Sequence, residues 1–384
     1  MKHHVFRLSI AVLLLGLLIA VLLLIRSNAA SEKKIEGLQK KLARFEQLSD
    51  GQENAAGART DPEGRTIFPP DRTSNVSGLG VGNRAVRRNP NKDKTIAVIP
   101  KGTASPWWEV VHEGAEDAAR EEGFEIFWTG PKLENDREKQ IQVVEDAVSQ
   151  RVAAIVLGPN DAFALVRPVE KAGKAGIPIV VIDSKPNTDA FDSFAATDNY
   201  AGGAEAARRL GKALNGKGKI IITHFLWNMT STDERAKGFK ETIVKEFPGI
   251  AIVAEQYTQG TVEDAIQKTT DLLIRNKDAD GVFAVNQPTS VGAYKAIQSR
   301  NLTKRVKFVG FDSDPLLLEG IEKGEVEALI VQDPYQIGYT GVKTAISVLK
   351  GEKVEKLIPI PGMIVDRNNI EEQKRKNPAA LGLQ

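Results

Sequence analysis

Residues 95–123 read TIAVIPKGTASPWWEVVHEGAEDAAREEG and describe a strand, a loop and a helix in that order. The apolar run at 95–99 has the length and composition of a buried strand. Ser105 can cap the helix that follows, and Pro106 suits its first helical position. The loop therefore joins the carboxyl end of a strand to the amino end of a helix.

The same alternation of short apolar runs and amphipathic helical patterns continues along the chain. Further runs lie at 124–128, 153–157, 178–182, 219–223, 250–254, 281–285, 306–310 and 327–331. Continuous apolar strands that alternate with helices are typical of parallel sheets covered on both faces. The polar break NGKGK at 215–219 divides the series into two similar halves. We therefore predict an α/β fold of two Rossmann-like lobes with parallel sheets.

The chain before this region has a different character. Residues 8–25, LSIAVLLLGLLIAVLLLI, are uncharged and almost wholly apolar. Arg26 follows directly, and residues 28–31 form a poor cleavage site. An uncleaved membrane anchor is therefore favoured over a cleaved signal peptide, which stays the alternative for residues 1–30. Residues 31–49 have the spacing of a short amphipathic helix, and residues 50–93 have the composition of a disordered linker.

Composition narrows the classes of function. Lys and Arg number 52 against 50 Asp and Glu, so the net charge of +2 does not point to nucleic acid. The absence of cysteine removes disulfides, thiolate metal sites and cysteine nucleophiles. Histidine is also scarce, with 4 in the chain, and two of these lie at the extreme N-terminus. We expect no metal and no cofactor.

The loops at the carboxyl ends of the predicted strands are the expected ligand site. They are rich in carboxylates, amides, hydroxyls and tryptophan. A flat aromatic ring covers the apolar face of a sugar, while Asp, Asn, Gln and Lys bond to its hydroxyls. Trp107 is therefore expected to contact a ligand. Trp108 shares a helix face with Val111 and Ala115, so a place in the core is an equal alternative for its ring.

Several separate segments carry a resemblance to a known family. They are SPWW at 105–108, the strand-end Asp183, ATDNYAGG at 196–203, ERAKGF at 234–239, the Asn286 loop with VGAYKAI, VGFD at 309–312 and VQDPYQIG at 331–338. Over residues 94–372 the chain resembles the type I periplasmic sugar-binding proteins of the ribose-binding group. These share their fold with the effector domains of lac-repressor-like regulators. The resemblance implies an extracytoplasmic protein that delivers a sugar to the permease of an ABC transporter.

The resemblance also implies lobe boundaries and a mode of ligand capture. One lobe would comprise residues 94–197 plus 333–361, and the other 198–332 plus 362–372, with a tail at 373–384. Three crossover strands would join the lobes, which would close on the ligand by hinge bending. A monomer is expected.

Residue by residue, the resemblance implies a ligand site in the cleft. Trp107 and Trp108 match stacking aromatics, and Ser105 belongs to the same loop. Thr197 matches a small polar contact near the hinge. The positions that bond sugar hydroxyls are matched by Asp183, Asn286, Asp312 and Gln332.

The sequence departs from the ribose-binding pattern at several of these positions. Lys101 replaces a small polar residue, and Ser184 stands where ribose binders carry an arginine. Asp233 takes the place of a ligand-bonding arginine, although Arg235 is retained. The stacking phenylalanine of the opposite lobe has no counterpart. Trp227 is the candidate replacement, with an exposed or packing role equally open.

These assignments predict an acidic site with Lys101 as the only expected cation. It would face Asp183, Asp233 and Asp312. Because closure removes water, an acidic ligand would bring unmatched negative charge into the site. Neutral monosaccharides or polyols are therefore expected first, amino sugars second, and sugar phosphates or uronic acids not at all.

Three other functions compete with sugar transport. Asp183 and Asp312 could act as the paired carboxylates of a glycoside hydrolase. Aspartates of this fold ordinarily accept sugar hydroxyls, however, so no enzyme is expected. A DNA-binding repressor would need a helix pair where this chain has an apolar segment and a polar linker. A membrane-anchored sugar sensor or chemoreceptor adaptor without a transport role is the alternative function.

Overall fold

The structure, a computed structural model, describes residues 59–60, 66–67 and 94–383. The predicted anchor at 8–25, the predicted helix at 31–49 and most of the predicted linker lie outside the described residues. The chain forms two compact units, residues 1–84 and 85–384. In the first unit, β1 (Arg59–Thr60) pairs antiparallel with β2 (Thr66–Ile67). None of the described helices combines the length and apolar character that a membrane span requires.

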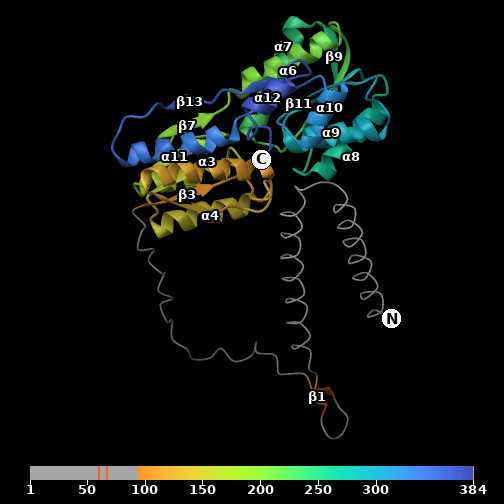
Figure 1. The fold of residues 1–384 in the computed structure, drawn as a ribbon. Helices are drawn as coiled ribbons and strands as arrows, with labels where there is room; N and C mark the ends of the chain where they lie inside the picture. The colour runs from red at the N-terminus through yellow and green to blue at the C-terminus, as the bar shows by residue number, and fades with distance from the viewer. Residues whose placement is uncertain (1–58, 61–65, 68–93, 384) are drawn as a thin grey trace, which may run out of the picture. The chain divides into compact units, whose positions relative to one another are not determined.

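One half of the second unit is a three-layer lobe, here called the N-lobe, to which α11 and β13 return late in the chain (Figure 1). Its six parallel strands lie in the order β13-β7-β6-β5-β3-β4. The strands are β3 (Thr95–Ile99), β4 (Glu125–Trp128), β5 (Ala154–Leu157), β6 (Ile179–Ile182), β7 (Ser193–Ala196) and β13 (Leu357–Pro359). Helices α3 (Pro106–Glu122) and α11 (Pro334–Leu349) pack on one face, and α4 (Arg137–Gln150) and α5 (Val166–Lys174) on the other.

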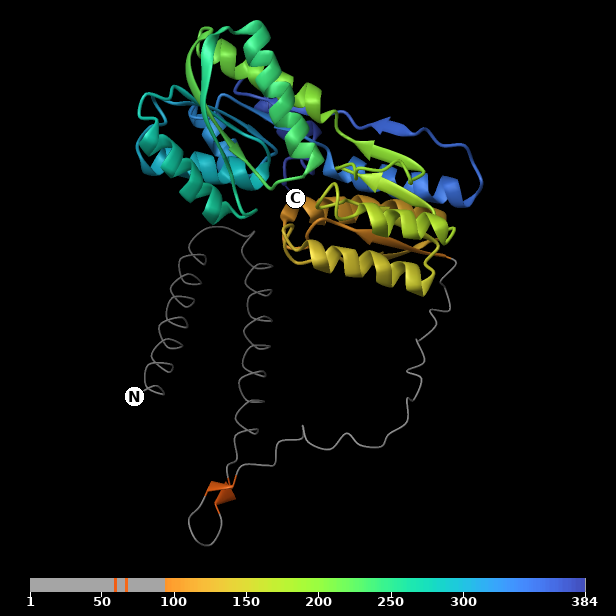
Figure 2. The ribbon, with the colours of Figure 1, turned by 180° about the vertical axis from the view of Figure 1, so that it is seen from behind.

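The second half repeats this plan as the C-lobe, with strand order β14-β12-β11-β10-β8-β9. The strands are β8 (Lys217–His224), β9 (Gly249–Tyr257), β10 (Gly281–Ala284), β11 (Lys307–Phe311), β12 (Ala328–Val331) and β14 (Met363–Val365). Helices α6 (Asn199–Ala213) and α7 (Thr230–Glu246) cover one face. The other face carries α8 (Val262–Arg275), α9 (Gln287–Ser299), α10 (Pro315–Lys323) and α12 (Ile370–Lys376). Figure 2 shows both lobes from behind.

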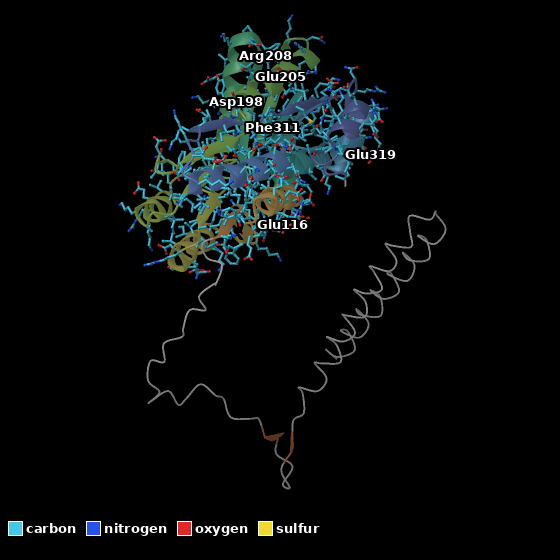
Figure 3. All side chains as sticks on the ribbon, turned by 60° about the vertical axis from the view of Figure 1, so that its left-hand side comes forward. Glu116, Asp198, Glu205, Arg208, Phe311 and Glu319 are labelled. Atoms are coloured by element: carbon cyan, nitrogen blue, oxygen red, sulfur yellow. The ribbon has the colours of Figure 1, made fainter. Side chains whose placement is uncertain are left out.

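The prediction of two α/β lobes is confirmed, with one correction to the sheets. In the C-lobe, β14 runs antiparallel to β12, so this sheet is not wholly parallel. Apolar side chains lie in the core and charged side chains at the surface, as expected for such layers (Figure 3). Phe311 lies inside the C-lobe, and the ion pair of Glu205 and Arg208 lies on its outer side. The core of each lobe is therefore formed by its own sheet and helices.

The chain crosses between the lobes at three places. It passes from β7 to α6, from β12 to α11, and from β13 to β14. Thr197 lies in the first crossing and Gln332 in the second. The carboxyl ends of the parallel strands of both sheets face the region between the lobes.

Each lobe also contains a close helix crossing that uses glycine. A Cβ on Gly114 in α3 would lie 2.1 Å from the Tyr335 carbonyl oxygen in α11. In the C-lobe, a Cβ on Gly203 in α6 would lie 1.9 Å from the Arg235 carbonyl oxygen in α7. Because these distances exclude any larger residue, the two glycines set the positions of α3 and α7. Both helices line the cavity described next.

Candidate ligand-binding site

One polar cavity lies between the lobes at the carboxyl ends of their strands. It encloses about 360 Å³ of space free of protein atoms, its open mouth included. Most of the predicted ligand-binding residues line it: Lys101, Ser105, Trp107, Trp108, Asp183, Asn286, Asp312 and Gln332. The wall is completed by Glu134, Met229, Ser231, Thr232, Arg235, Gln287 and Pro288.

Two buried aspartates occupy equivalent places in the two lobes. Asp183 directly follows β6, and Asp312 directly follows β11. Both have left-handed backbone conformations, with φ of 61° and 63°. Such values are uncommon for residues other than glycine, and Asp and Asn adopt them more readily than most. Each strand therefore ends in a turn that directs a carboxylate into the region between the lobes.

Lys101 joins the two lobes across the cavity. Its side chain is 3% exposed, and its ammonium forms an ion pair with Asp183 in the N-lobe. The same ammonium donates to the Ser231 hydroxyl of the C-lobe at 3.2 Å. Ser184 also donates to Ser231, at 2.8 Å between the two hydroxyl oxygens. One C-lobe hydroxyl thus interacts with two N-lobe side chains.

Arg235 is a second cation in the cavity wall, although only Lys101 was predicted. Its side chain, 2% exposed, donates to the Asn199 side-chain oxygen at 2.8 Å and to the Val285 carbonyl at 2.9 Å. The guanidinium lies 4.1 Å from the centre of the Phe311 ring and 3.7 Å from the Asp312 carboxylate. Burial lowers the pKa of Arg235, and nearby Asp312 opposes that effect. The expectation of a single cation is therefore wrong.

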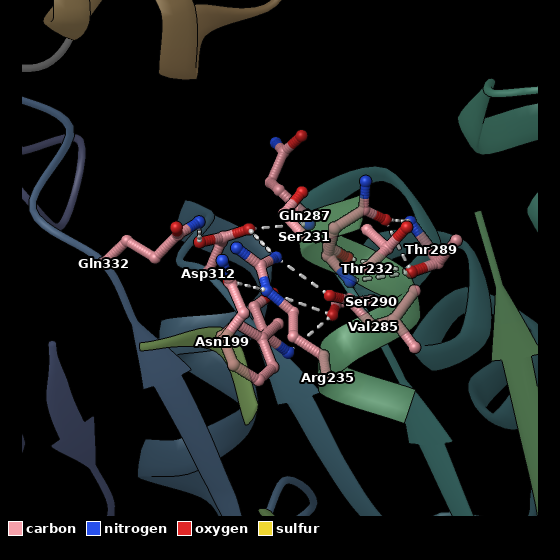
Figure 4. A network of polar contacts seen from close by, with 12 residues as sticks. Asn199, Ser231, Thr232, Arg235, Val285, Gln287, Thr289, Ser290, Asp312 and Gln332 are labelled. Atoms are coloured by element: carbon pink, nitrogen blue, oxygen red, sulfur yellow. Dashed lines mark hydrogen bonds and ion pairs between the residues drawn. The ribbon is translucent and has the colours of Figure 1, made fainter. Parts of the chain in front are cut away.

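The Asp312 carboxylate is held from several directions (Figure 4). It accepts from the Gln332 amide at 2.9 Å and from the Gln287 backbone N–H at 3.1 Å. Burial raises the pKa of Asp312, while the nearby Arg235 lowers it. The side-chain oxygen of Gln332 is buried and has no hydrogen-bond partner among the described residues. A ligand hydroxyl is a suitable donor for it.

The two tryptophans have different roles in the wall. Trp108 is 2% exposed and packs in the core of the N-lobe, which favours the alternative left open for it. Its indole N–H nevertheless donates to Glu134 at 3.0 Å. Burial raises the pKa of Glu134, and Lys101 opposes this. Trp107 is half-buried and meets Trp108 edge to face, with ring centres 4.8 Å apart.

Asn286 connects the cavity to the start of α9. Its side-chain oxygen accepts from the Thr289 hydroxyl at 2.8 Å and from the Thr289 backbone N–H at 3.4 Å. Because these bonds occupy the oxygen, the amide nitrogen of Asn286 is the group available to a ligand. The cavity thereby offers amide and guanidinium donors beside carboxylate acceptors, and aromatic rings form part of its wall. This combination suits a small polyhydroxylated molecule.

Three predicted residues lie outside the residues that line this cavity. Thr197 is buried at the first crossing, where its hydroxyl lacks a partner among the described residues. Trp227 is 60% exposed and stacks on Tyr257 with ring centres 3.5 Å apart. Asp233 is half-buried on α7, where burial raises its pKa and His224 opposes this. The structure thus gives Trp227 the exposed position that was the alternative.

Sequence analysis missed one carboxylate that had a recognisable signal. Glu134 lies in the loop that follows β4, at the same sheet edge as the other site loops. The cavity residues at 229–232 gave a weaker signal, because serine and threonine near a helix start are common as caps.

Two α/β lobes with a polar cavity between them are the arrangement expected of a bilobal solute-binding protein. Residues 96–353 match the family described as "Periplasmic binding protein domain", and the chain belongs to this family. The predicted resemblance to type I periplasmic sugar-binding proteins is confirmed. The ribose import binding protein of Haemophilus influenzae is 29% identical over 276 residues, which cover 72% of this chain and 92% of that protein.

Solved structures of sugar-bound solute-binding proteins are also similar to this chain. A carbohydrate transporter solute-binding protein from Agrobacterium radiobacter, in complex with D-arabinose, is 36% identical to this chain, with a TM-score of 0.71. The match covers 75% of this chain and 98% of that protein's chain. An ABC transporter solute-binding protein from Agrobacterium vitis, with bound D-fucose, is also 36% identical with a TM-score of 0.71. That match covers 76% of this chain and 100% of the other. The relatives are solute-binding proteins and not enzymes, and their family is periplasmic.

Proposed function

We propose that this protein captures a neutral monosaccharide or polyol between its lobes and delivers it to an ABC transporter. The observation that carries the proposal is the composition of the cavity wall. Trp107 offers a ring to the apolar face of a sugar, while Asp183, Asp312 and Asn286 face its hydroxyls. The relatives solved with D-arabinose and D-fucose support a neutral sugar as the ligand.

The charges of the cavity support the same ligand class, even when Arg235 is counted as a second cation. Lys101 is paired with Asp183, and Arg235 lies beside Asp312. Glu134 adds a carboxylate whose only hydrogen bond from the described residues comes from Trp108. Carboxylates therefore still outnumber cations by one. An acidic ligand would increase that excess in a closed site, whereas a neutral or amino sugar would not.

Capture would proceed by hinge bending about the three crossings, with Thr197 and Gln332 in the moving segments. The bonds from Lys101 and Ser184 to Ser231 would form as the lobes meet. Delivery requires a permease that recognises the closed form. We propose a monomer outside the cytoplasm, held at the membrane by residues 8–25, with a cleaved signal peptide as the alternative. A sugar sensor or chemoreceptor adaptor remains the second candidate function.

Thermal-shift screening of the chain against a sugar panel tests the proposal. A ligand at one hundred times its Kd stabilises by about 2.7 kcal/mol, which such an assay detects readily. The panel contains D-ribose, D-arabinose, D-fucose, D-allose and neutral polyols. We expect at least one neutral member to raise the Tm. No shift with any neutral sugar or polyol would contradict the proposal.

A further inference from the structure

A second hollow adjoins the ligand cavity on the other side of Trp107. It encloses about 880 Å³, its open mouth included. We call it the tail groove, because its walls are the start of α3, the start of α10 and the C-terminal residues 379–382. Trp107 and Gln287 line both the tail groove and the ligand cavity. These two side chains therefore form the boundary between the spaces.

The tail groove, like the cavity, has one wall from each lobe. Leu381 is fully buried in the core of the C-lobe, and the Ser313 hydroxyl donates to the Ala380 carbonyl at 2.9 Å. The tail is thus attached to the C-lobe. The opposite wall, with Val110, belongs to α3 of the N-lobe. Lobe closure consequently narrows the tail groove and the ligand cavity together.

The lining of the tail groove suits a neutral ring. Its apolar part comes from Pro106, Trp107, Val110, Pro315 and Leu381. Among the described residues that line it, none is a lysine, arginine or histidine, whereas three are acidic: Glu109, Glu113 and Asp314. An anionic group would find no countercharge there.

The two boundary side chains separate the spaces. The Gln287 amide donates to Asp314 at 3.2 Å, and Figure 4 shows its side chain directed away from the Asp312 carboxylate. Trp107 is half-buried, in contrast to the buried Trp108. A substituent that passes from one space to the other would have to displace the Gln287 side chain, which breaks its bond to Asp314 but leaves the buried ion pairs of Lys101 and Arg235 intact.

We propose that the tail groove is a second ligand subsite and that the protein accepts O-glycosides. The sugar would occupy the ligand cavity, and the neutral ring attached to it, a second sugar or an aryl group, would lie in the tail groove. This inference rests on the proposed sugar-binding function. The proposed ligand carries a substituent that a site for a monosaccharide alone would exclude.

Calorimetric titration of the full chain tests this with matched pairs of ligands. Each neutral sugar of the panel is compared with its α- and β-phenyl glycosides. We expect at least one phenyl glycoside to bind with a Kd within tenfold of the parent sugar. Val110→Trp fills the tail groove from α3. It should weaken the binding of that glycoside at least tenfold and leave the Kd of the parent sugar unchanged. Ala379→Trp fills the groove from the opposite wall and should have the same effect.

The outcomes separate this inference from the proposed function. If parent sugars bind but every phenyl glycoside is weaker by more than tenfold, the second subsite is wrong and the sugar-binding function stands. The subsite is also wrong if both tryptophan variants fold, as circular dichroism would show, and bind the glycoside like the unaltered protein. If neither sugars nor glycosides bind, both proposals fail.

Discussion

The ammonium of Lys101 donates to the Ser231 hydroxyl at 3.2 Å and so links the two lobes. The same ammonium neutralises Asp183, which follows the fourth strand of the N-lobe. One side chain therefore contributes to the charge balance of the cavity and to contact between the lobes. Its position also explains why a lysine can replace the small polar residue expected there.

Removal of Lys101 should destabilise the protein strongly. Lys101→Met leaves Asp183 buried without its partner, and loss of one partner of a buried ion pair costs about 3–5 kcal/mol. Lys240→Met is the matched control, because Lys240 pairs with Glu255 at the surface, where a pair contributes about 0–1 kcal/mol. Urea unfolding measures the free energy of unfolding of both variants. Equal stabilities of the two variants would show that the Lys101 pair has no structural importance.

The two adjacent tryptophans should respond differently to alanine. Trp107→Ala should weaken sugar binding at least tenfold and preserve the fold, because loss of a stacked ring costs about 1.5–3 kcal/mol. Trp108→Ala should lower the free energy of unfolding by about 3–5 kcal/mol, since it empties a core site. Calorimetry and thermal melts separate the effects. A collapse of the Tm in Trp107→Ala with unchanged affinity would assign that ring to the core instead.

Stability should fall at low pH through Glu255. The hydrogen bond from His224 lowers its pKa from 4.5 to about 2, with Lys240 acting in the same direction. A carboxylate with a depressed pKa stabilises the folded state above its unfolded pKa and loses this effect as pH falls through the folded value. Glu255→Gln should therefore flatten the stability profile between about pH 4.5 and 2. Urea midpoints across that range measure it, and parallel profiles for both proteins would contradict the assignment.

The state of the N-terminus has a direct test. We expect the native protein to retain residues 8–25, because Arg26 and residues 28–31 make a poor cleavage site. N-terminal sequencing of protein purified from its own membranes gives the answer. A mature start near Ser31 would establish the cleaved signal peptide and exclude the anchor.

The sequence predicted the architecture well where apolar runs were long. The buried strands β3, β5 and β6 appeared as continuous apolar runs, whereas β4 alternates between exposed and half-buried residues. The strands that were missed, β7, β13 and β14, have four, three and three residues. β13 and β14 are too short to show a period, and tertiary pairing decides their structure. β7 is as long as β5 and β6, but its sequence SFAA lacks the β-branched residues that mark those strands.

The limits of the site prediction lie in side-chain direction. Asp233 and Arg235 are two positions apart on α7, and residues at this spacing point to different helix faces. Only Arg235 lines the cavity, although Asp233 was expected there. Trp227 likewise belongs to a site loop, but its ring stacks on Tyr257. The positions of the motifs in the sequence identified the correct loops. The direction of each side chain depended on contacts between elements that are far apart in the sequence.

Calorimetric titration with matched neutral, amino and acidic forms of one sugar tests the central claim most directly. The account predicts binding of one neutral sugar per chain, weaker binding of its amino form, and no binding of its uronic acid or phosphate. The reason is the excess of carboxylates over Lys101 and Arg235 in the cavity. Tight binding of the uronic acid or phosphate would show that the cavity accepts an anion and would contradict the account.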